Sequence, residues 1–168
     1  VILEFINKEG KPDFIESQDY LGLAYYILLA KHTLNPLLAN TQIIITLHTP
    51  AFVYLPYNNI STYKIPTLGV CEMEKHSIIG ADILIAPSVF IKNLITRELN
   101  LQNREITVIK NPFQNDRTEL IQDYDKTSIA YLGKLSKQKG CFFLLDSMKQ
   151  LWNSGSNISL TLIGNRDM

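Results

Sequence analysis

The sequence lacks the features of a nucleic-acid-binding or membrane-spanning protein. Lysine plus arginine and aspartate plus glutamate each number 16, so the 168-residue chain has a formal net charge of zero. Binding through a broad basic surface needs an excess of cations to neutralise phosphates. No apolar run approaches the roughly 20 residues of a membrane-spanning helix. We therefore expect a cytoplasmic protein that does not bind nucleic acid.

Cysteine is scarce as well. Cys71 and Cys141 are the two cysteines of the chain, and each lies in an apolar stretch. They are far apart in sequence and do not have the spacing of metal ligands. We expect two reduced thiols in the core, which suits a reducing cytoplasm.

Strand and helix patterns alternate along the first two thirds of the chain. The segment QIIITLH is apolar on both faces and β-branched, which is typical of a central strand in a parallel sheet. Ser88 is a good N-cap for the helix that follows it. We predict strands at 13–17, 42–48, 82–87 and 105–110, helices at 1–8, 21–34, 67–80 and 89–99, and a long ordered loop at 49–66. This alternation predicts an α/β fold with parallel strands.

The pattern breaks at residues 111–126, a polar stretch that contains Pro112, and then resumes. A strand at 128–132, a helix at about 139–153 and a strand at 158–163 are predicted after it. One β-α-β unit cannot by itself bury both faces of a sheet. We therefore expect a piece of a longer protein that holds the back part of one domain, a linker and the front of a second, truncated domain.

The loop GKLSKQKG, between the strand at 128–132 and the next helix, carries three cations between two glycines. Lys134, Lys137 and Lys139 lie between Gly133 and Gly140. A helix N-terminus attracts anions through its free N–H groups and its dipole, and neighbouring lysines add charge. The loop is either a phosphate site or a solvated charged segment, and these residues alone leave both readings open.

Ligands of open α/β sheets bind beyond the carboxyl ends of the strands, and further residues lie at such positions. His48 ends the strand at 42–48 and precedes the long loop, which favours a functional role. Asp19 follows the first strand, and its simplest role is to cap the next helix. Asp19, Gly22 and Gly164 are also candidates for lining a cleft.

Five motifs resemble, in the same order, those of retaining GT-B glycosyltransferases of the family 4 type. KPDFIESQDYLGLAYYILLA resembles the family's strand and helix after a Pro-Asp pair, and IIITLHTP resembles its strand that ends at a histidine. MEKHSIIGADILIAPSVFIKNLI resembles its helix with Glu followed by Ala-Asp, strand and serine, and ITVIKNPF resembles its entry to the linker. YLGKLSKQKGCFFLLDSMKQL with ISLTLIGN resembles the opening of its second domain.

The resemblance covers nearly the whole chain and implies parts of two Rossmann-like parallel-sheet domains. Residues 1–110 would be the back part of the N-terminal, acceptor-side domain, 111–127 the interdomain linker, and 128–168 the first β-α-β of the C-terminal, donor-binding domain. The family's Gly-rich loop and its Glu-x7-Glu segment would lie outside this sequence. We therefore expect the 168-residue fragment alone to be inactive.

The resemblance also implies a hexosyltransferase-type reaction from a nucleotide-diphosphate sugar to an acceptor hydroxyl. Gly133, Lys134, Lys139 and Gly140 would bind the donor diphosphate, and His48 would be the catalytic histidine near the reacting sugar. Fixed cations stabilise the departing diphosphate, so no metal and no further cofactor is required. Position 134 is Lys where the family usually has Arg, so it supplies a charge without the bidentate fork.

Other matches and other functions stay open at this point. Glu74, Asp82, Ser88 and Asn111 also match the family, but capping and packing explain them well enough. The expected partners are a nucleotide sugar and a carbohydrate or lipid-linked acceptor, with peripheral membrane contact left to parts outside this sequence. A sugar-nucleotide epimerase or phosphorylase of the same architecture is one alternative. A truncated, non-catalytic binding or assembly piece is another.

Overall fold

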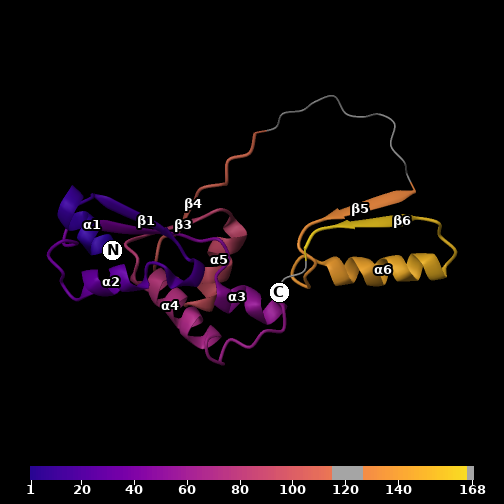
Figure 1. The fold of residues 1–168 in the computed structure, drawn as a ribbon, viewed down its shortest axis with the longest axis horizontal. Helices are drawn as coiled ribbons and strands as arrows, with labels where there is room; N and C mark the ends of the chain where they lie inside the picture. The colour runs from indigo at the N-terminus through magenta and orange to yellow at the C-terminus, as the bar shows by residue number, and fades with distance from the viewer. Residues whose placement is uncertain (115–126, 166–168) are drawn as a thin grey trace. The chain divides into compact units, whose positions relative to one another are not determined.

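The computed structural model describes residues 1–114 and 127–165, which form two compact units (Figure 1). The first unit comprises Val1–Pro56 and Ile60–Pro112, and the second contains the elements after the residues drawn in grey. The expected linker falls largely on residues 115–126, which lie outside the described residues. The assignment of the two units as acceptor-side and donor-binding domains stays a prediction.

The first unit is a parallel four-stranded sheet covered by helices. Its strands are β1 (Phe14–Gln18), β2 (Gln42–Thr46), β3 (Ile83–Ala86) and β4 (Thr107–Val108), in the order β1-β2-β3-β4. The helical elements are α1 (Ile2–Glu9), η1 (Tyr20–Gly22), α2 (Tyr25–His32), α3 (Ala51–Tyr57), α4 (Thr67–Gly80) and α5 (Val89–Glu98). All three strand pairings are parallel, as the alternating pattern predicts.

The core of this unit lies between the sheet and its helices. Ile43 and Ile45 of β2 are fully buried, in one cluster with Leu28 of α2, Ile78 of α4 and Ile95 of α5. β2 lies between β1 and β3, and the face that carries Ile43 and Ile45 is fully buried, whereas Ile44 and Thr46 on the other face are half-buried. Burial of such side chains contributes about 1.5–3 kcal/mol each to folding.

The second unit is a β-α-β motif built from β5 (Ser128–Leu132), α6 (Cys141–Asn153) and β6 (Ser159–Ile163). The two strands are parallel, with Ser128 opposite Ser159 and Leu132 opposite Ile163. Cys141 and Met148 of α6 are buried, and Trp152 donates its indole N–H to the carbonyl of Ile158 at 2.6 Å. Both cysteines of the chain are buried and unbridged, as the sequence predicts.

The prediction of a continuous loop at residues 49–66 is wrong, because α3 occupies its first half. The sequence does not indicate this helix, because Pro50 and Pro56 at its two ends are typical of turns. The carbonyl of Pro50 accepts from the amides of Val53 and Tyr54, and Pro56 lies in the last turn. Ala51, Val53 and Leu55 are buried, so packing stabilises a segment whose prolines suggested a turn.

Several element ends also differ from the prediction. The helix predicted at 21–34 is the 3-10 turn η1 followed by α2, and β4 is shorter than the predicted strand. In the part of the chain that the structure describes, no helix is long and apolar enough to cross a bilayer.

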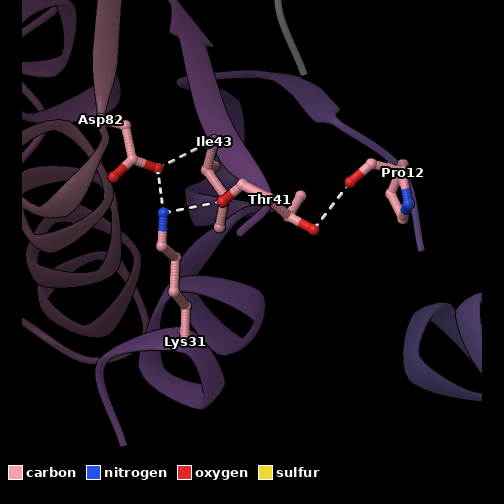
Figure 2. A network of polar contacts seen from close by, with 5 residues as sticks. All are labelled: Pro12, Lys31, Thr41, Ile43 and Asp82. Atoms are coloured by element: carbon pink, nitrogen blue, oxygen red, sulfur yellow. Dashed lines mark hydrogen bonds and ion pairs between the residues drawn. The ribbon is translucent and has the colours of Figure 1, made fainter. Parts of the chain in front are cut away.

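The amino ends of β2 and β3 are joined by a polar network (Figure 2). The ammonium of Lys31 donates to Asp82 Oδ2 at 2.5 Å and to the carbonyl of Thr41 at 2.7 Å. The same Asp82 oxygen accepts from the amide of Ile43 at 2.6 Å, and Thr41 Oγ1 donates to the carbonyl of Pro12 at 2.8 Å. The network therefore ties α2, the strand starts and the segment before β1 together.

Candidate functional site

The carboxyl ends of β1, β2 and β3 lie at one edge of the first sheet, because the strands are parallel. Asp19 directly follows β1, and His48 lies two residues beyond β2. The amide of Asp19 donates to the carbonyl of Thr46 at 3.2 Å, which brings the two strand exits side by side. The structure therefore brings Asp19 and His48 together, and the His48 residue is exposed at this edge.

Asp19 does not cap the next helix, so that expectation is wrong. Its side chain makes no capping bond to η1. Its Oδ2 instead accepts from the backbone amide of His48 at 3.0 Å, and the residue is only 1% exposed. The reason is the close approach of the two strand exits, which offers the carboxylate a donor from the neighbouring strand. Ser88, by contrast, caps α5 as predicted by accepting from the amide of Ile91 at 3.2 Å.

Glu74 lies under this edge, in the middle of α4, and is completely buried. Its Oε1 accepts from the amide of Leu21 at 3.0 Å and its Oε2 from the amide of Ala51 at 2.6 Å. One carboxylate thus bridges the turn after β1 and the start of α3. The sequence explanation by capping and packing misses this bridge, because the two donors lie 53 and 23 residues from Glu74.

Burial governs the protonation of both carboxyl groups. Desolvation raises the pKa of Glu74 to about 7, against the opposing effect of the backbone N–H groups of Ala51 and Leu21, and the nearby charge of Asp19 adds to the rise. Desolvation also raises the pKa of Asp19, while the His48 amide and imidazole act in the opposite direction. Asp19 Oδ1 is buried and has no hydrogen-bond partner among the described residues.

The turn that carries these contacts is tightly constrained. Leu21 has a φ of +54° and Gly22 a φ of +62°, a conformation that suits glycine and is unfavourable for leucine. A Cβ on Gly22 would lie 2.4 Å from the Cβ of Met73, so a larger residue would push the turn away from α4. Gly22 is therefore buried against the helix that carries Glu74.

The lysine loop lies between β5 and α6, as the sequence predicts. Gly140 precedes α6 with a φ of +74°, and Lys134, Lys137 and Lys139 are all exposed. The hydroxyl of Tyr131 donates to the carbonyl of Lys134 at 2.7 Å, and the amide of Leu135 donates to the carbonyl of Asn165 at 2.9 Å. The loop backbone is therefore fastened to the ends of both strands.

Two glycines and one serine define the inner side of this loop. A Cβ on Gly164 would lie 1.8 Å from the carbonyl oxygen of Gly133, so the two strand ends meet backbone to backbone. Ser136 is 6% exposed, and its Oγ has no hydrogen-bond partner in the described part of the chain. Sequence reasoning did not single out Ser136, because a serine between two lysines looks like an ordinary solvated residue.

A groove of about 560 Å³ lies elsewhere, between α2 and α4. Its walls include Tyr25, Tyr26, Met73 and His76. None of the candidate residues at the sheet edge lines it.

Comparison with known proteins gives a partial likeness. No family model matches the chain. The chain is 34% identical over 89 residues to the lipopolysaccharide 1,2-N-acetylglucosaminetransferase of Salmonella typhimurium. The matched region covers 48% of this chain and 23% of that enzyme, so the chain spans less than a quarter of its relative. Over about half its length, the chain is therefore similar to part of a lipopolysaccharide glycosyltransferase.

Proposed function

We propose that this chain is part of a retaining glycosyltransferase of the GT-B type. The protein would transfer a sugar from a nucleotide-diphosphate donor to a hydroxyl of a carbohydrate or lipid-linked acceptor. The observation that carries the proposal is the likeness to the Salmonella N-acetylglucosaminetransferase. The parallel α/β architecture of both units supports it, since GT-B enzymes are built from such sheets. The relative's name makes N-acetylglucosamine the first sugar to test.

The lysine loop would hold the donor diphosphate. Lys134 and Lys139 flank the segment that leads into the N-terminus of α6, a helix of 13 residues. The first N–H groups of a helix lack partners within the helix and favour anions. A diphosphate gains negative charge as it leaves the sugar, so cations placed here lower the energy of the transition state more than that of the ground state.

His48 would act on the reacting sugar from the first unit. Its exposed position at the strand exit supports this role, because ligands of parallel sheets bind at that edge. An imidazole can hydrogen-bond a sugar hydroxyl or move a proton near neutral pH. His48→Ala in the intact protein should lower turnover much more than donor affinity, as measured by nucleotide release from a panel of nucleotide sugars that includes UDP-N-acetylglucosamine.

Binding of UDP, GDP and ADP to the intact protein tests the diphosphate site. A charge-assisted hydrogen bond contributes about 1.5–3 kcal/mol. Lys134→Ala and Lys139→Ala should therefore weaken binding of the matching diphosphate by about 10- to 100-fold. Binding of the corresponding nucleoside should change little, because it carries no phosphate.

Lys137→Ala is the matched control, because Lys137 lies in the same loop and is also exposed. It should change the dissociation constant less than about twofold. Equal losses in all three variants would indicate a diffuse positive patch. Normal binding in all three would place the phosphate site elsewhere and reject the proposal.

A further inference from the structure

Two buried carboxyl groups join the same two segments at the carboxyl edge of the first sheet. Asp19 lies in the turn after β1 and accepts from the amide of His48 at 3.0 Å. Glu74, from α4, accepts from the amide of Leu21 in that first turn and from the amide of Ala51 three residues beyond His48. The segment from His48 to Ala51 is thus held at both ends, because the amide of each of these two residues donates to a carboxylate oxygen.

These hydrogen bonds fix the position of the His48 backbone, from which the imidazole side chain extends. The His48 backbone is bonded to one carboxylate, and the helix that starts at Ala51 is bonded to the other. The His48 residue is itself exposed, so its backbone rather than packing determines its place at the edge. Catalytic groups must be held within a fraction of an ångström of their working position, which makes such support chemically useful.

We propose that Asp19 and Glu74 are positioning residues that hold the backbone of His48 at the carboxyl edge of the sheet. This rests on the proposed function in that His48 is taken to act on the sugar. We call Asp19, Glu74 and the amides of Leu21, His48 and Ala51 the carboxyl clasp. The clasp needs an ionised Glu74. Both of its oxygens must accept from a backbone N–H, whereas protonation turns one of them into an O–H donor.

The groups that act electrostatically on the clasp come from each segment packed around it. Burial is the main cause that raises the pKa of both Glu74 and Asp19; the charge of Asp19 adds to the rise at Glu74, and the His48 imidazole opposes the rise at Asp19. Cys71, one turn earlier on α4, is buried and has its pKa raised by Glu74, after the larger effect of its own burial. Because the clasp needs an ionised Glu74 and the pKa of this carboxyl group is raised to about 7, turnover should rise with pH through about 7.

Glu74→Gln tests the clasp without changing side-chain size. A glutamine has one acceptor oxygen, so one of the two amides loses its partner. In the intact protein, amide hydrogen exchange should accelerate at least tenfold in the peptide that covers the amide left without an acceptor, either Leu21 or Ala51. The imidazole NMR signals of His48, assigned by their loss in His48→Gln, should shift. Glu72→Gln is the control, because Glu72 lies on the same helix in an exposed pair with Lys75.

Asp19 provides a graded test. Asp19→Asn keeps an oxygen for the His48 amide, whereas Asp19→Ala removes it. Exchange at His48 should stay within about twofold of wild type in the first variant and rise at least tenfold in the second. With a donor turned over by the wild type, Glu74→Gln and Asp19→Ala should lower kcat about tenfold and leave the donor KM within twofold.

The outcomes separate the clasp from the function on which it rests. Unchanged exchange and unchanged His48 signals in Glu74→Gln would overturn the clasp, whatever the enzyme does. A KM effect without a kcat effect would also overturn it. Unchanged turnover in His48→Ala would reject the proposed role of His48, even where the exchange data confirm the hydrogen bonds.

Discussion

Asp82 should be the most stability-sensitive charged residue at the amino edge of the first sheet. Its Oδ2 accepts both the Lys31 ammonium at 2.5 Å and the Ile43 amide at 2.6 Å. The side chains of Lys31 and Asp82 are 17% and 31% exposed, so water replaces these bonds only in part. Asp82→Ala leaves the amide of the buried Ile43 without its acceptor and leaves Lys31 with the carbonyl of Thr41.

The magnitude follows from these two losses. An unsatisfied buried donor costs about 1–3 kcal/mol, and a partly exposed ion pair contributes up to about 1 kcal/mol. We expect Asp82→Ala to lower the free energy of unfolding by about 2–3 kcal/mol. Asp82→Asn, which keeps an acceptor for the amide, should cost about half as much.

Urea denaturation followed by far-UV circular dichroism measures the loss, and amide exchange of Ile43 locates it in β2. Glu72→Ala is the matched control, because it breaks an exposed ion pair with Lys75 that bridges no strands. It should cost less than about 1 kcal/mol. The reasoning is refuted if Asp82→Ala and Glu72→Ala cost the same, or if Ile43 exchanges at the wild-type rate in Asp82→Ala.

Two further predictions concern the buried acid and the paired glycines. Glu74 has its pKa raised by burial from 4.5 to about 7, so the folded state binds its proton more tightly than the unfolded state, and stability should fall as pH rises from about 4.5 to 7. The shift corresponds to at most about 3 kcal/mol, and urea titrations at pH 5 and pH 8 should show a smaller difference in Glu74→Gln than in wild type. Gly164→Ala should destabilise the second unit by about 3 kcal/mol, because the new Cβ would meet the carbonyl oxygen of Gly133 at 1.8 Å. Fluorescence of Trp152 in urea reports on that unit, and Gly155→Ala, whose Cβ meets nothing within 4 Å, should cost about 1 kcal/mol for its positive φ alone.

The sheets were predictable because strong, local patterns encode them. Ile43, Ile44 and Ile45 form an apolar β-branched run, and Ile83–Ala86 is a second short apolar run, so both strands and their parallel pairing follow from sequence. The helix α3 was missed because Pro50 and Pro56 are local signals for a turn, whereas the burial of Val53 and Leu55 depends on distant segments. Tertiary packing overrides the local preference there.

The sequence predicted where along the chain the candidate residues lie, but not the hydrogen bonds that they make. His48 follows from the rule that ligands lie at strand exits, and the lysine loop follows from its charges and its place before a helix. The roles of Glu74 and Asp19 could not be read from sequence, because their partners are backbone amides far along the chain. A backbone N–H has no residue-specific signature, so only the folded chain reveals which carboxylate holds it.

The two edges of the first sheet differ in whether their charged side chains are paired with an opposite charge. At the amino edge, Lys31 and Asp82 have opposite charges, and Asp82 Oδ2 accepts hydrogen bonds from both the Lys31 ammonium and the Ile43 amide. At the carboxyl edge, two acids are buried within electrostatic reach of each other, Leu21 adopts a left-handed conformation, and Asp19 Oδ1 has no partner among the described residues. Each of these features costs stability, and apolar residues of similar size would avoid the electrostatic part of that cost. Locally unfavourable arrangements of this kind are concentrated at functional sites. The carboxyl edge around His48 is therefore where substitutions that increase stability should most often reduce activity.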